Sequence, residues 1–292
     1  MRIVLTGATG FIGGWLLRRL MADHEVICLT RKADGLPSHA NVKIVSQDLT
    51  KPLETAKLPA SVDAIIHMAQ SRQFRKFPEE AQDIFDVNVS STQRLLDYAR
   101  KVKVGQFILA SSGGVCGYPA RPALESDPPD LLNHYLTTKY AAETLVQSYS
   151  NQFVPLILRY FFVYGEGQRR MFMPSLVERV LHGKAVTVNG QTGVAMNPIH
   201  VSDAVEATVR ALELDRAEVI NVAGPDVTTI MDLARRIGQA AGREPVYQFE
   251  AEKGPLAMIA SIEKMRLRLG VTPKISLHDG IARVVADVRS TG

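Results

Sequence analysis

Short apolar runs alternate with amphipathic segments along the N-terminal half of the chain. Continuous apolar runs predict strands buried on both faces, whereas apolar positions three and four apart predict helices. The predicted strands are Arg2–Thr6, Glu25–Thr30, Val42–Val45, Asp63–His67, Gln106–Ala110 and Pro155–Arg159. The predicted helices are one with Ile12, Leu16, Leu17 and Leu20 on its apolar face, and two others around Ala81–Arg100 and Tyr135–Ser150. This alternation predicts a doubly wound α/β fold, a parallel sheet covered by helices whose ligands bind at the carboxyl ends of the strands.

The pattern becomes irregular after Gly165, where glycines, prolines and short elements predominate. Two later segments return to the earlier pattern, because Asn197–Asp203 opens a helix and Glu218–Val222 predicts another strand. We therefore expect two discontinuous domains. Residues 1–165 plus 198–224 would form the larger one, and residues 166–197 plus 225–292 a smaller C-terminal substrate-binding lobe.

Charge and composition exclude several classes of function. The net charge is only +4 and the lysines and arginines are scattered, so the sequence predicts no nucleic-acid partner. The two cysteines, Cys28 and Cys116, fit no metal-ligand spacing, which predicts a reduced, intracellular chain without a metal site. Neither a signal peptide nor an apolar stretch long enough to cross a bilayer is visible, so we expect a cytoplasmic protein with no membrane partner.

Three glycines, Gly7, Gly10 and Gly13, occupy the turn between the first predicted strand and its helix. Glycine permits a tight turn and a close approach of the backbone to a pyrophosphate. The N-terminus of the following helix offers free N–H groups and a positive dipole end. This spacing at a strand–helix junction favours a Rossmann-type dinucleotide site over a turn that binds nothing.

The end of the second predicted strand bears on the choice of cofactor. NAD sites usually carry a carboxylate there, about twenty residues after the glycines, which binds the ribose hydroxyls. Here the strand ends in Leu29-Thr30-Arg31-Lys32, without an acid. The planar guanidinium of Arg31 suits a 2′-phosphate, although the two cations also fit a solvated turn. The expected cofactor is therefore NAD or NADP, and Arg31 together with the missing acid favours NADP.

Tyr135 and Lys139 lie four residues apart in a predicted helix and so share one face. A free phenol, with a pKa of ~10, is a poor base at neutral pH, but a nearby ammonium favours the phenolate. Tyr135 can then take a proton from an alcohol or return one to a ketone. Ser112 follows the strand that begins at Gln106, where its hydroxyl can share charge on the reacting oxygen. The neighbouring Ser111 is expected only to satisfy backbone groups of the turn.

These motifs together resemble the extended short-chain dehydrogenase/reductase family, in its NAD-dependent epimerase/dehydratase branch, over nearly the whole chain. The matching segments are Thr6–Gly13 with T-G-x-x-G-x-x-G, Ser112–Gly117 with S-x-x-V-Y-G, Tyr135–Lys139 with Y-x-x-x-K, Arg159–Gly165 with R-x-F-N-V-Y-G, and Ile199–Asp203 with I-H-V-x-D. The resemblance implies catalysis by Ser112, Tyr135 and Lys139.

Beside Arg31, the predicted cofactor-binding residues are Gly7, Gly10, Phe11, Ile12, Gly13, Asp48, Leu49, Met68, Ala69, Asn88, Tyr135, Lys139 and Phe161. The resemblance also implies a homodimer formed through the two long helices around residues 81–100 and 135–150. His67 and His200 lie inside strand-end motifs and are expected to be structural.

Departures from the family pattern concern the substrate. Phe162 replaces an asparagine that helps to hold the diphosphate in the family's nucleotide-sugar enzymes, and Met196 stands where an arginine usually contacts it. Lys253-Gly254 lies where a second arginine-glycine is common. Phe and Met offer a diphosphate no hydrogen-bond donor. Either the substrate lacks a diphosphate, or other cations hold it, and the candidates are Arg169, Arg170, Lys184 and Lys253.

Two smaller departures follow Ser112. Cys116 replaces the tyrosine of V-Y-G and is expected to be a small buried residue without a chemical role. Glycines stand in place of the acidic pair that the family's 4,6-dehydratases use, which argues against dehydration.

The sequence thus predicts an NAD(P)-dependent epimerase of the 4-epimerase type, acting at a hydroxyl or keto carbon of a sugar or nucleotide sugar. The alternative is an NADPH-dependent reductase of a keto-sugar or other small carbonyl compound, which Arg31 favours. A non-catalytic NADP-binding sensor is the least favoured, since such proteins usually lose the tyrosine or the lysine that this chain retains.

Overall fold

The computed structural model describes residues 1–254 and 257–291. The chain forms two compact units, each assembled from segments that are distant in the sequence. Unit 1 comprises Met1–Gly117, Pro128–Tyr160 and Val205–Ile220, and unit 2 comprises Tyr118–Asp127, Phe161–Ala204 and Asn221–Gly292.

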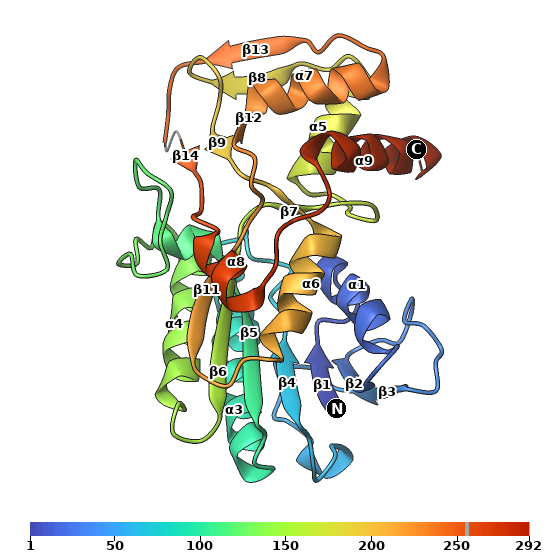
Figure 1. The fold of residues 1–292 in the computed structure, drawn as a ribbon, viewed down its shortest axis with the longest axis vertical. Helices are drawn as coiled ribbons and strands as arrows, with labels where there is room; N and C mark the ends of the chain where they lie inside the picture. The colour runs from blue at the N-terminus through green and yellow to red at the C-terminus, as the bar shows by residue number, and fades with distance from the viewer. Residues whose placement is uncertain (255–256, 292) are drawn as a thin grey trace. The chain divides into compact units, whose positions relative to one another are not determined.

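A seven-stranded sheet in the order β11-β6-β5-β4-β1-β2-β3 organises unit 1 (Figure 1). Its strands are β1 (Arg2–Thr6), β2 (Glu25–Thr30), β3 (Val42–Ser46), β4 (Ala64–His67), β5 (Gln106–Ser112), β6 (Val154–Tyr160) and β11 (Glu218–Val222). The pairings among β1 to β6 are parallel, so the carboxyl ends of these strands share one edge. The strand order reverses at β1, which lies between β2 and β4, and ligands of doubly wound sheets bind at such a reversal. The predicted fold class is confirmed.

Helices pack on this sheet as the apolar periodicity predicts. Helix α1 (Phe11–Leu20) packs against β1 and β2, and α4 (His134–Ser148) packs against β5 and β6. The segment expected to be one helix is divided into α2 (Ala81–Phe85), a π-helical turn (Asp86–Ser90) and α3 (Ser91–Lys101), which packs against α4. Helix α6 (Val201–Ala211) begins within the I-H-V-x-D segment.

The core of unit 1 lies where the sheet meets α3 and α4. Strand residues Val4, Ile65 and Phe107 are fully buried there, because the apolar runs leave no polar face to expose. The helices contribute Leu95, Leu96, Ala99, Ala142 and Val146 to the same cluster. Each such large side chain contributes about 1.5–3 kcal/mol on burial, which keeps the strand ends in place.

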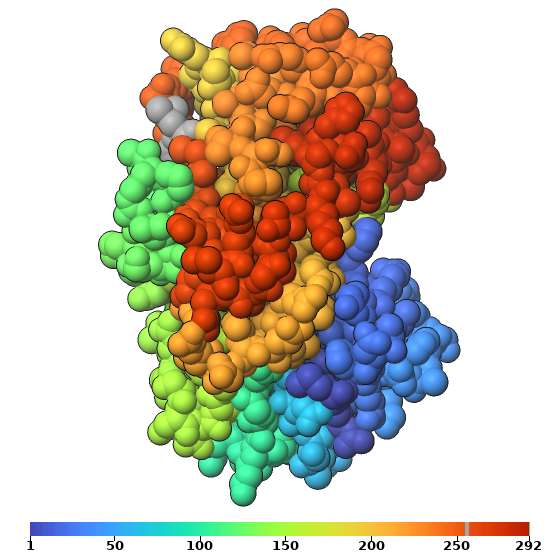
Figure 2. All heavy atoms as spheres, in the orientation of Figure 1, coloured from blue at the N-terminus to red at the C-terminus, as the bar shows by residue number. Residues whose placement is uncertain are grey.

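Unit 2 has a separate hydrophobic core, formed mainly by α5 (Phe172–Leu181), α7 (Ile230–Ala241) and α9 (Leu277–Thr291). Short strands accompany these helices in pairs. Strand β7 (Val163–Tyr164) pairs with β10 (Ile199–His200), and β8 (Val186–Asn189) pairs with β13 (Tyr247–Glu250). Strand β9 (Ala195–Met196) pairs with both β12 (Thr228–Thr229) and β14 (Ala257–Met258). Helix α8 (Glu263–Leu269) lies at the surface in Figure 2, and its Leu267 is 75% exposed.

No helix within residues 1–254 and 257–291 is both long and apolar enough to cross a membrane. The same residues contain no group of three or more His, Cys, Asp or Glu side chains placed to bind a metal ion.

Candidate active site

The glycine-rich turn after β1 admits no side chain at two of its positions. Gly7 has a φ of +74°, and a Cβ added to it would lie 2.7 Å from the Ala69 backbone nitrogen. A Cβ on Gly13 would lie 2.1 Å from the Gly7 carbonyl oxygen. The Gly10 N–H donates to the same Gly7 carbonyl at 2.9 Å, which closes the turn. Glycine is therefore required here for close backbone packing, as the motif predicts.

The N-terminus of α1 leaves its first N–H groups available to a ligand. Its N-cap residue, Gly10, has no side chain, and the first turn contains no acid. Phe11 and Ile12 begin the helix, so their N–H groups stand at the positive end of its dipole. An anionic pyrophosphate is the group that this arrangement suits. The residues present thus fit a dinucleotide cofactor.

The ends of β2 and β3 bring Arg31 and Asp48 under mutual electrostatic influence. Hydrogen bonds from Thr50 lower the pKa of the Asp48 carboxyl, and the positive charge of Arg31 adds to this effect. The Thr50 N–H and hydroxyl both donate to Asp48 Oδ1 at 2.9 Å. Arg31 itself is exposed, and the Leu49 carbonyl accepts a hydrogen bond from Arg94.

The end of β4 is held by a buried polar cluster. The Thr6 hydroxyl bonds His67 Nδ1 at 2.7 Å and accepts the Ala69 N–H at 3.1 Å. Burial lowers the pKa of His67 to about 3, and the charge of Lys139 acts in the same direction, so the imidazole is neutral. A neutral ring enclosed in this way orders the β1 and β4 ends rather than exchanging protons. Met68, the neighbouring predicted cofactor residue, is half-buried.

Helix α4 presents the predicted catalytic tyrosine in its first turn. Asn133 caps the helix, because its side chain accepts the Leu136 N–H at 3.0 Å. The Tyr135 hydroxyl donates to Gln70 Oε1 at 3.0 Å and is also hydrogen-bonded by Ser112. Burial raises the pKa of Tyr135 to about 12, and the hydrogen bond from Ser112 opposes that rise. The structure thus brings Ser112 and Tyr135 together from β5 and α4.

Lys139 lies one turn beyond Tyr135 and is buried, at 3% exposure. Its Nζ donates to the Ala110 carbonyl oxygen at the end of β5. Burial lowers the pKa of Lys139 to about 8, and the negative charge of Glu143 opposes this. The ammonium form therefore still predominates at neutral pH.

A second turn further along α4, Glu143 enters a buried ionic network with Arg159 of β6. Arg159 Nη2 donates to Glu143 Oε2 at 2.7 Å, and Ser111 Oγ donates to Glu143 Oε1. Arg159 Nη1 reaches Cys116 Sγ at 3.3 Å. Burial lowers the pKa of Arg159, but the hydrogen bonds and charge of Glu143, together with Cys116, outweigh burial and raise that pKa. The expected backbone role of Ser111 is therefore wrong in part, because its hydroxyl serves a buried carboxylate.

Within unit 2, the residues expected to distinguish the substrate are largely packing residues. Met196 is 2% exposed and lies in the core formed by α5, α7 and α9. Phe162 packs against that core, and its ring centroid lies 6.1 Å from that of Phe172. Phe161 is buried, and its N–H donates to the Val222 carbonyl at 3.0 Å.

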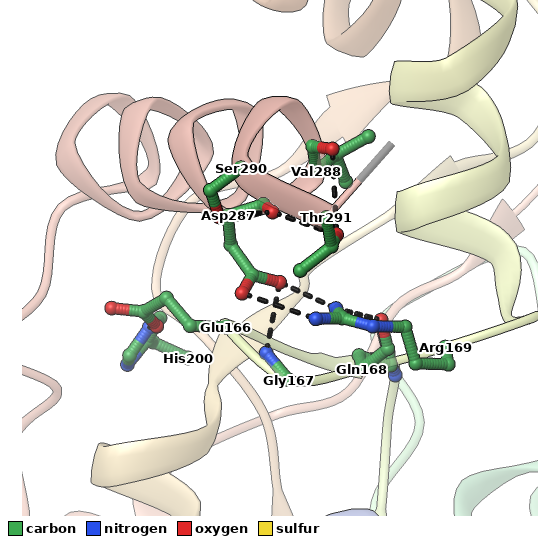
Figure 3. A network of polar contacts seen from close by, with 9 residues as sticks. All are labelled: Glu166, Gly167, Gln168, Arg169, His200, Asp287, Val288, Ser290 and Thr291. Atoms are coloured by element: carbon green, nitrogen blue, oxygen red, sulfur yellow. Dashed lines mark hydrogen bonds and ion pairs between the residues drawn. The ribbon is translucent and has the colours of Figure 1, made fainter.

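Figure 3 shows that one of the candidate cations is already paired. Arg169 Nη2 lies 3.2 Å from Asp287 Oδ1, and the Gly167 N–H donates to Asp287 Oδ2 at 3.0 Å. The hydrogen bond from Arg169 holds the pKa of the Asp287 carboxyl below its usual range. In the same view, His200 Nε2 contacts Glu166 at 2.8 Å.

The profile of the NAD dependent epimerase/dehydratase family matches residues 3–223. The chain belongs to this family. It is 28% identical to a UDP-glucose epimerase of Bacillus subtilis (strain 168), described as uncharacterized, over 99% of this chain and 98% of that protein. It is 28% identical to UDP-glucuronic acid decarboxylase 6 of Arabidopsis thaliana, over 99% of this chain and 89% of the relative. The structure of UDP-glucuronic acid 4-epimerase from Bacillus cereus with UDP-glucuronic acid and NAD covers 100% of both chains, at a TM-score of 0.91 and 26% identity.

The family resemblance inferred from the motifs is confirmed, and the chain is an enzyme of the extended short-chain dehydrogenase/reductase type. Phe162 has a φ of +43°, a backbone conformation that asparagine tolerates better than phenylalanine. Its aromatic ring is partly buried against the unit 2 core.

The remaining candidate cations, Arg170, Lys184 and Lys253, are exposed, and none of them forms an ion pair with another described residue. Arg169 is the least suited to a diphosphate, because a ligand would have to compete with Asp287 for its guanidinium.

Sequence reasoning missed two residues near the catalytic tyrosine. Gln70 follows the predicted strand end by three residues, but no motif connects it with Tyr135, which is 65 positions away. Glu143 had a detectable signal, since it stands four residues after Lys139 and shares its helix face. An acid on the buried face of an amphipathic helix needs a partner, and that requirement predicts a buried cation such as Arg159.

Proposed function

We propose that this protein is an NAD(P)-dependent 4-epimerase of a UDP-sugar. The observation that carries the proposal is the Tyr135 hydroxyl, which hydrogen-bonds Ser112 while Lys139 lies buried one turn away on the same helix. The turn at Gly7–Gly13 in the same unit fits a dinucleotide. Similarity over the full chain to enzymes named for UDP-glucose and UDP-glucuronic acid supports a UDP-sugar as the substrate.

In the proposed reaction Tyr135 acts as base and then as acid. Its phenolate takes the proton of a sugar hydroxyl, Ser112 donates to the reacting oxygen, and a keto sugar results. After the sugar turns over, the same tyrosine returns the proton to the oxygen of the epimerised carbon. A bound nicotinamide dinucleotide supplies reversible hydride exchange and, when oxidised, a positive ring. Lys139 favours the phenolate throughout, because its ammonium is buried one turn further along the same helix.

A net reductase is the second candidate, and two observations favour it. The β2 end has no carboxylate and presents Arg31, which suits the 2′-phosphate of exchangeable NADPH. Met196 and Phe162 offer a substrate diphosphate no donor and pack in the unit 2 core. A reductase would use Ser112, Tyr135 and Lys139 in the same roles but would consume cofactor once per turnover.

Cofactor retention and product analysis separate the two candidates. The purified protein is denatured and its released nucleotide identified, and the enzyme is then incubated with UDP-glucose or UDP-glucuronic acid. An epimerase retains its cofactor and forms the C4 epimer, observed by proton NMR, without net NADPH oxidation. Stoichiometric NADPH consumption by a 4-keto sugar, with no interconversion of the UDP-sugars, would replace the epimerase with the reductase. The NADP preference, the homodimer and the cytoplasmic location stay predictions.

A further inference from the structure

The segment after β4 contacts the phenol of Tyr135 directly. Gln70 lies three residues beyond His67, the last residue of β4, and its Oε1 accepts the Tyr135 O–H at 3.0 Å. Ser112 bonds the same hydroxyl from β5. The proton carrier therefore has two polar neighbours, one hydroxyl and one amide. Only the hydroxyl belongs to the Ser/Tyr/Lys set of the family motifs.

A chain of buried hydrogen bonds ties this segment to α4. The Ser71 N–H donates to Asn88 Oδ1 at 3.0 Å, and Asn88 Nδ2 donates to the Thr138 hydroxyl at 3.0 Å. That hydroxyl in turn donates to the Tyr135 carbonyl at 2.8 Å. Ser71 and Asn88 are 1% and 3% exposed, so these bonds are protected from water. The position of Gln70 opposite the phenol is thus set by its neighbour Ser71.

Aromatic contacts also hold the segment after β4 against α4. The Phe74 ring packs 5.2 Å from the Tyr135 ring, and Phe77 stacks on His134 at 4.8 Å. The Arg75 guanidinium lies 5.1 Å from the Phe74 centroid, on the side of a ring that attracts cations. These contacts limit the freedom of the Tyr135 ring, so the phenol and the Gln70 amide meet in one geometry.

We propose that Gln70 is a further catalytic residue, whose amide holds the Tyr135 hydroxyl in the resting enzyme and sets the pH at which the tyrosine accepts a proton. This proposal rests on the proposed function. An amide oxygen accepts from the phenol but offers nothing to the phenolate, so this bond favours the protonated form. Half a turn of the amide presents Nε2, which donates to the phenolate after the proton has moved. In the described part of the chain, Gln70 Nε2 makes no hydrogen bond, because the bond to Tyr135 is made by Oε1.

The charged groups around this contact come from several elements, and one of them is negative, because Asp83 of α2 accepts a hydrogen bond from the Ser71 hydroxyl next to Gln70. Helix α4 contributes Lys139 and the neighbouring His134, the segment after β4 contributes Arg75 through Phe74, and β5 contributes the neutral Ser112. A carboxylate introduced at position 70 would place a negative charge within hydrogen-bond distance of the phenol. Such a carboxylate would disfavour the phenolate and so raise the Tyr135 pKa.

Two substitutions at position 70 test the proposal in opposite directions. Gln70→Glu places a negative charge at the phenol and should raise the Tyr135 pKa further. Gln70 is exposed, so Gln70→Ala removes the acceptor and leaves the phenol facing water, and should lower that pKa by roughly 0.5 to 1 pH unit, the equivalent of one hydrogen bond. The matched control is Gln73→Glu, the same charge change in the same segment, because the Gln73 side chain makes no hydrogen bond to Tyr135.

The Tyr135 pKa is measured in the full chain with ¹³Cζ-labelled tyrosine, and its signal is assigned by its loss in Tyr135→Phe. Because this titration needs no substrate, it tests Gln70 even if the proposed UDP-sugar activity is not found. With an active substrate, the ascending limb of kcat/KM against pH should move up in Gln70→Glu and down in Gln70→Ala. The proposal would be overturned if the Tyr135 pKa in both Gln70→Glu and Gln70→Ala were the same as in the control Gln73→Glu.

Discussion

The Tyr135 phenol is held in its protonated form by its own surroundings. Burial raises its pKa to about 12, and Gln70 accepts its proton in a hydrogen bond. Base catalysis at neutral pH would therefore depend on groups that favour the phenolate, such as Ser112, which hydrogen-bonds it, and Lys139, which is buried one turn further along α4. The pKa of Lys139 is about 8, so this ammonium loses its charge at moderately alkaline pH.

Substitution of Tyr135 by Phe tests the proton carrier itself. The ring and its packing against Phe74 stay, but the hydroxyl is lost. We expect kcat to fall by about two to four orders of magnitude while cofactor affinity barely changes. Steady-state kinetics and fluorescence titration of the cofactor measure the two effects. Near-normal turnover of the true substrate by Tyr135→Phe would show that another group carries the proton.

Substitution of Arg31 by Ala tests the choice between NAD and NADP. If its guanidinium binds a 2′-phosphate, Arg31→Ala should weaken NADPH binding by about 1–3 kcal/mol and leave NADH nearly unchanged. The adjacent exposed Lys32→Ala is the control for a general loss of positive charge. The dissociation constants of NADPH and NADH are measured for the wild type and for both variants. Equal losses for NADPH and NADH would mean that Arg31 only shapes the turn, and NAD would be the cofactor.

Helix α4 places three ionisable groups on one face at intervals of four residues, namely Tyr135, Lys139 and Glu143. In the proposed reaction the first carries the proton and the second favours its phenolate, whereas the third bonds Arg159 on β6. Glu143 is 0% exposed, so its charge cannot be compensated by water. The helix thus links the catalytic turn to the sheet through an ion pair as well as through apolar packing.

The variant Glu143→Gln leaves the buried Arg159 without its counterion. Removing one partner of a buried pair should lower the free energy of unfolding by about 3–5 kcal/mol. Glu206→Gln is the matched control, because Glu206 pairs with Arg210 at the surface of α6 and should cost less than about 0.5 kcal/mol. Urea denaturation measures the free energy of unfolding of Glu143→Gln and of Glu206→Gln.

The same variant also changes the pH dependence of activity. Glu143 opposes the effect of burial on Lys139, so its loss should move the Lys139 pKa further below about 8. A lysine with a lower pKa loses its charge at lower pH, and the alkaline limb of kcat should shift downward with it. An unmoved alkaline limb in a folded Glu143→Gln protein would show that Lys139 does not control that limb.

At the scale of the whole molecule, the chain divides into two units with separate cores. Unit 1 contains Ser112, Tyr135 and Lys139, whereas unit 2 contains the residues that the sequence predicts to distinguish the substrate. In unit 2, Met196 lies in the core and Phe162 packs against it. Arg169 is paired with Asp287. Recognition of a diphosphate would then depend on Arg170, Lys184 or Lys253.

A thermal-shift panel of UDP, GDP, dTDP and CDP, with cofactor present, tests that recognition in the intact chain. A nucleotide that binds the folded state raises the Tm in proportion to the logarithm of its concentration over its Kd. We expect UDP to stabilise the protein more than the other three, and Arg170→Ala, Lys184→Ala and Lys253→Ala to identify the contact. No shift from any nucleotide at millimolar concentration would point to a smaller, uncharged ketone as the substrate.

The sequence by itself determined the features that depend on local geometry. Continuous apolar runs such as Ile3–Leu5 predict buried parallel strands wherever they occur, and the spacing of Gly7, Gly10 and Gly13 predicts a turn without room for side chains. Tyr135 and Lys139 share a face because a helix repeats about every four residues. Such inferences need no knowledge of what lies opposite, so they extend to the fold class and the catalytic helix.

Only the tertiary structure decided which distant side chains meet. Gln70 reaches Tyr135 across 65 residues, Arg159 meets Glu143 across the interface of β6 and α4, and Arg169 pairs with Asp287 across 118 residues. The sequence leaves many partners possible for each of these polar groups. Packing of apolar faces brings the elements together, and burial then obliges the enclosed charges to find partners. The reactivity of Tyr135 is set by neighbours that the fold supplies.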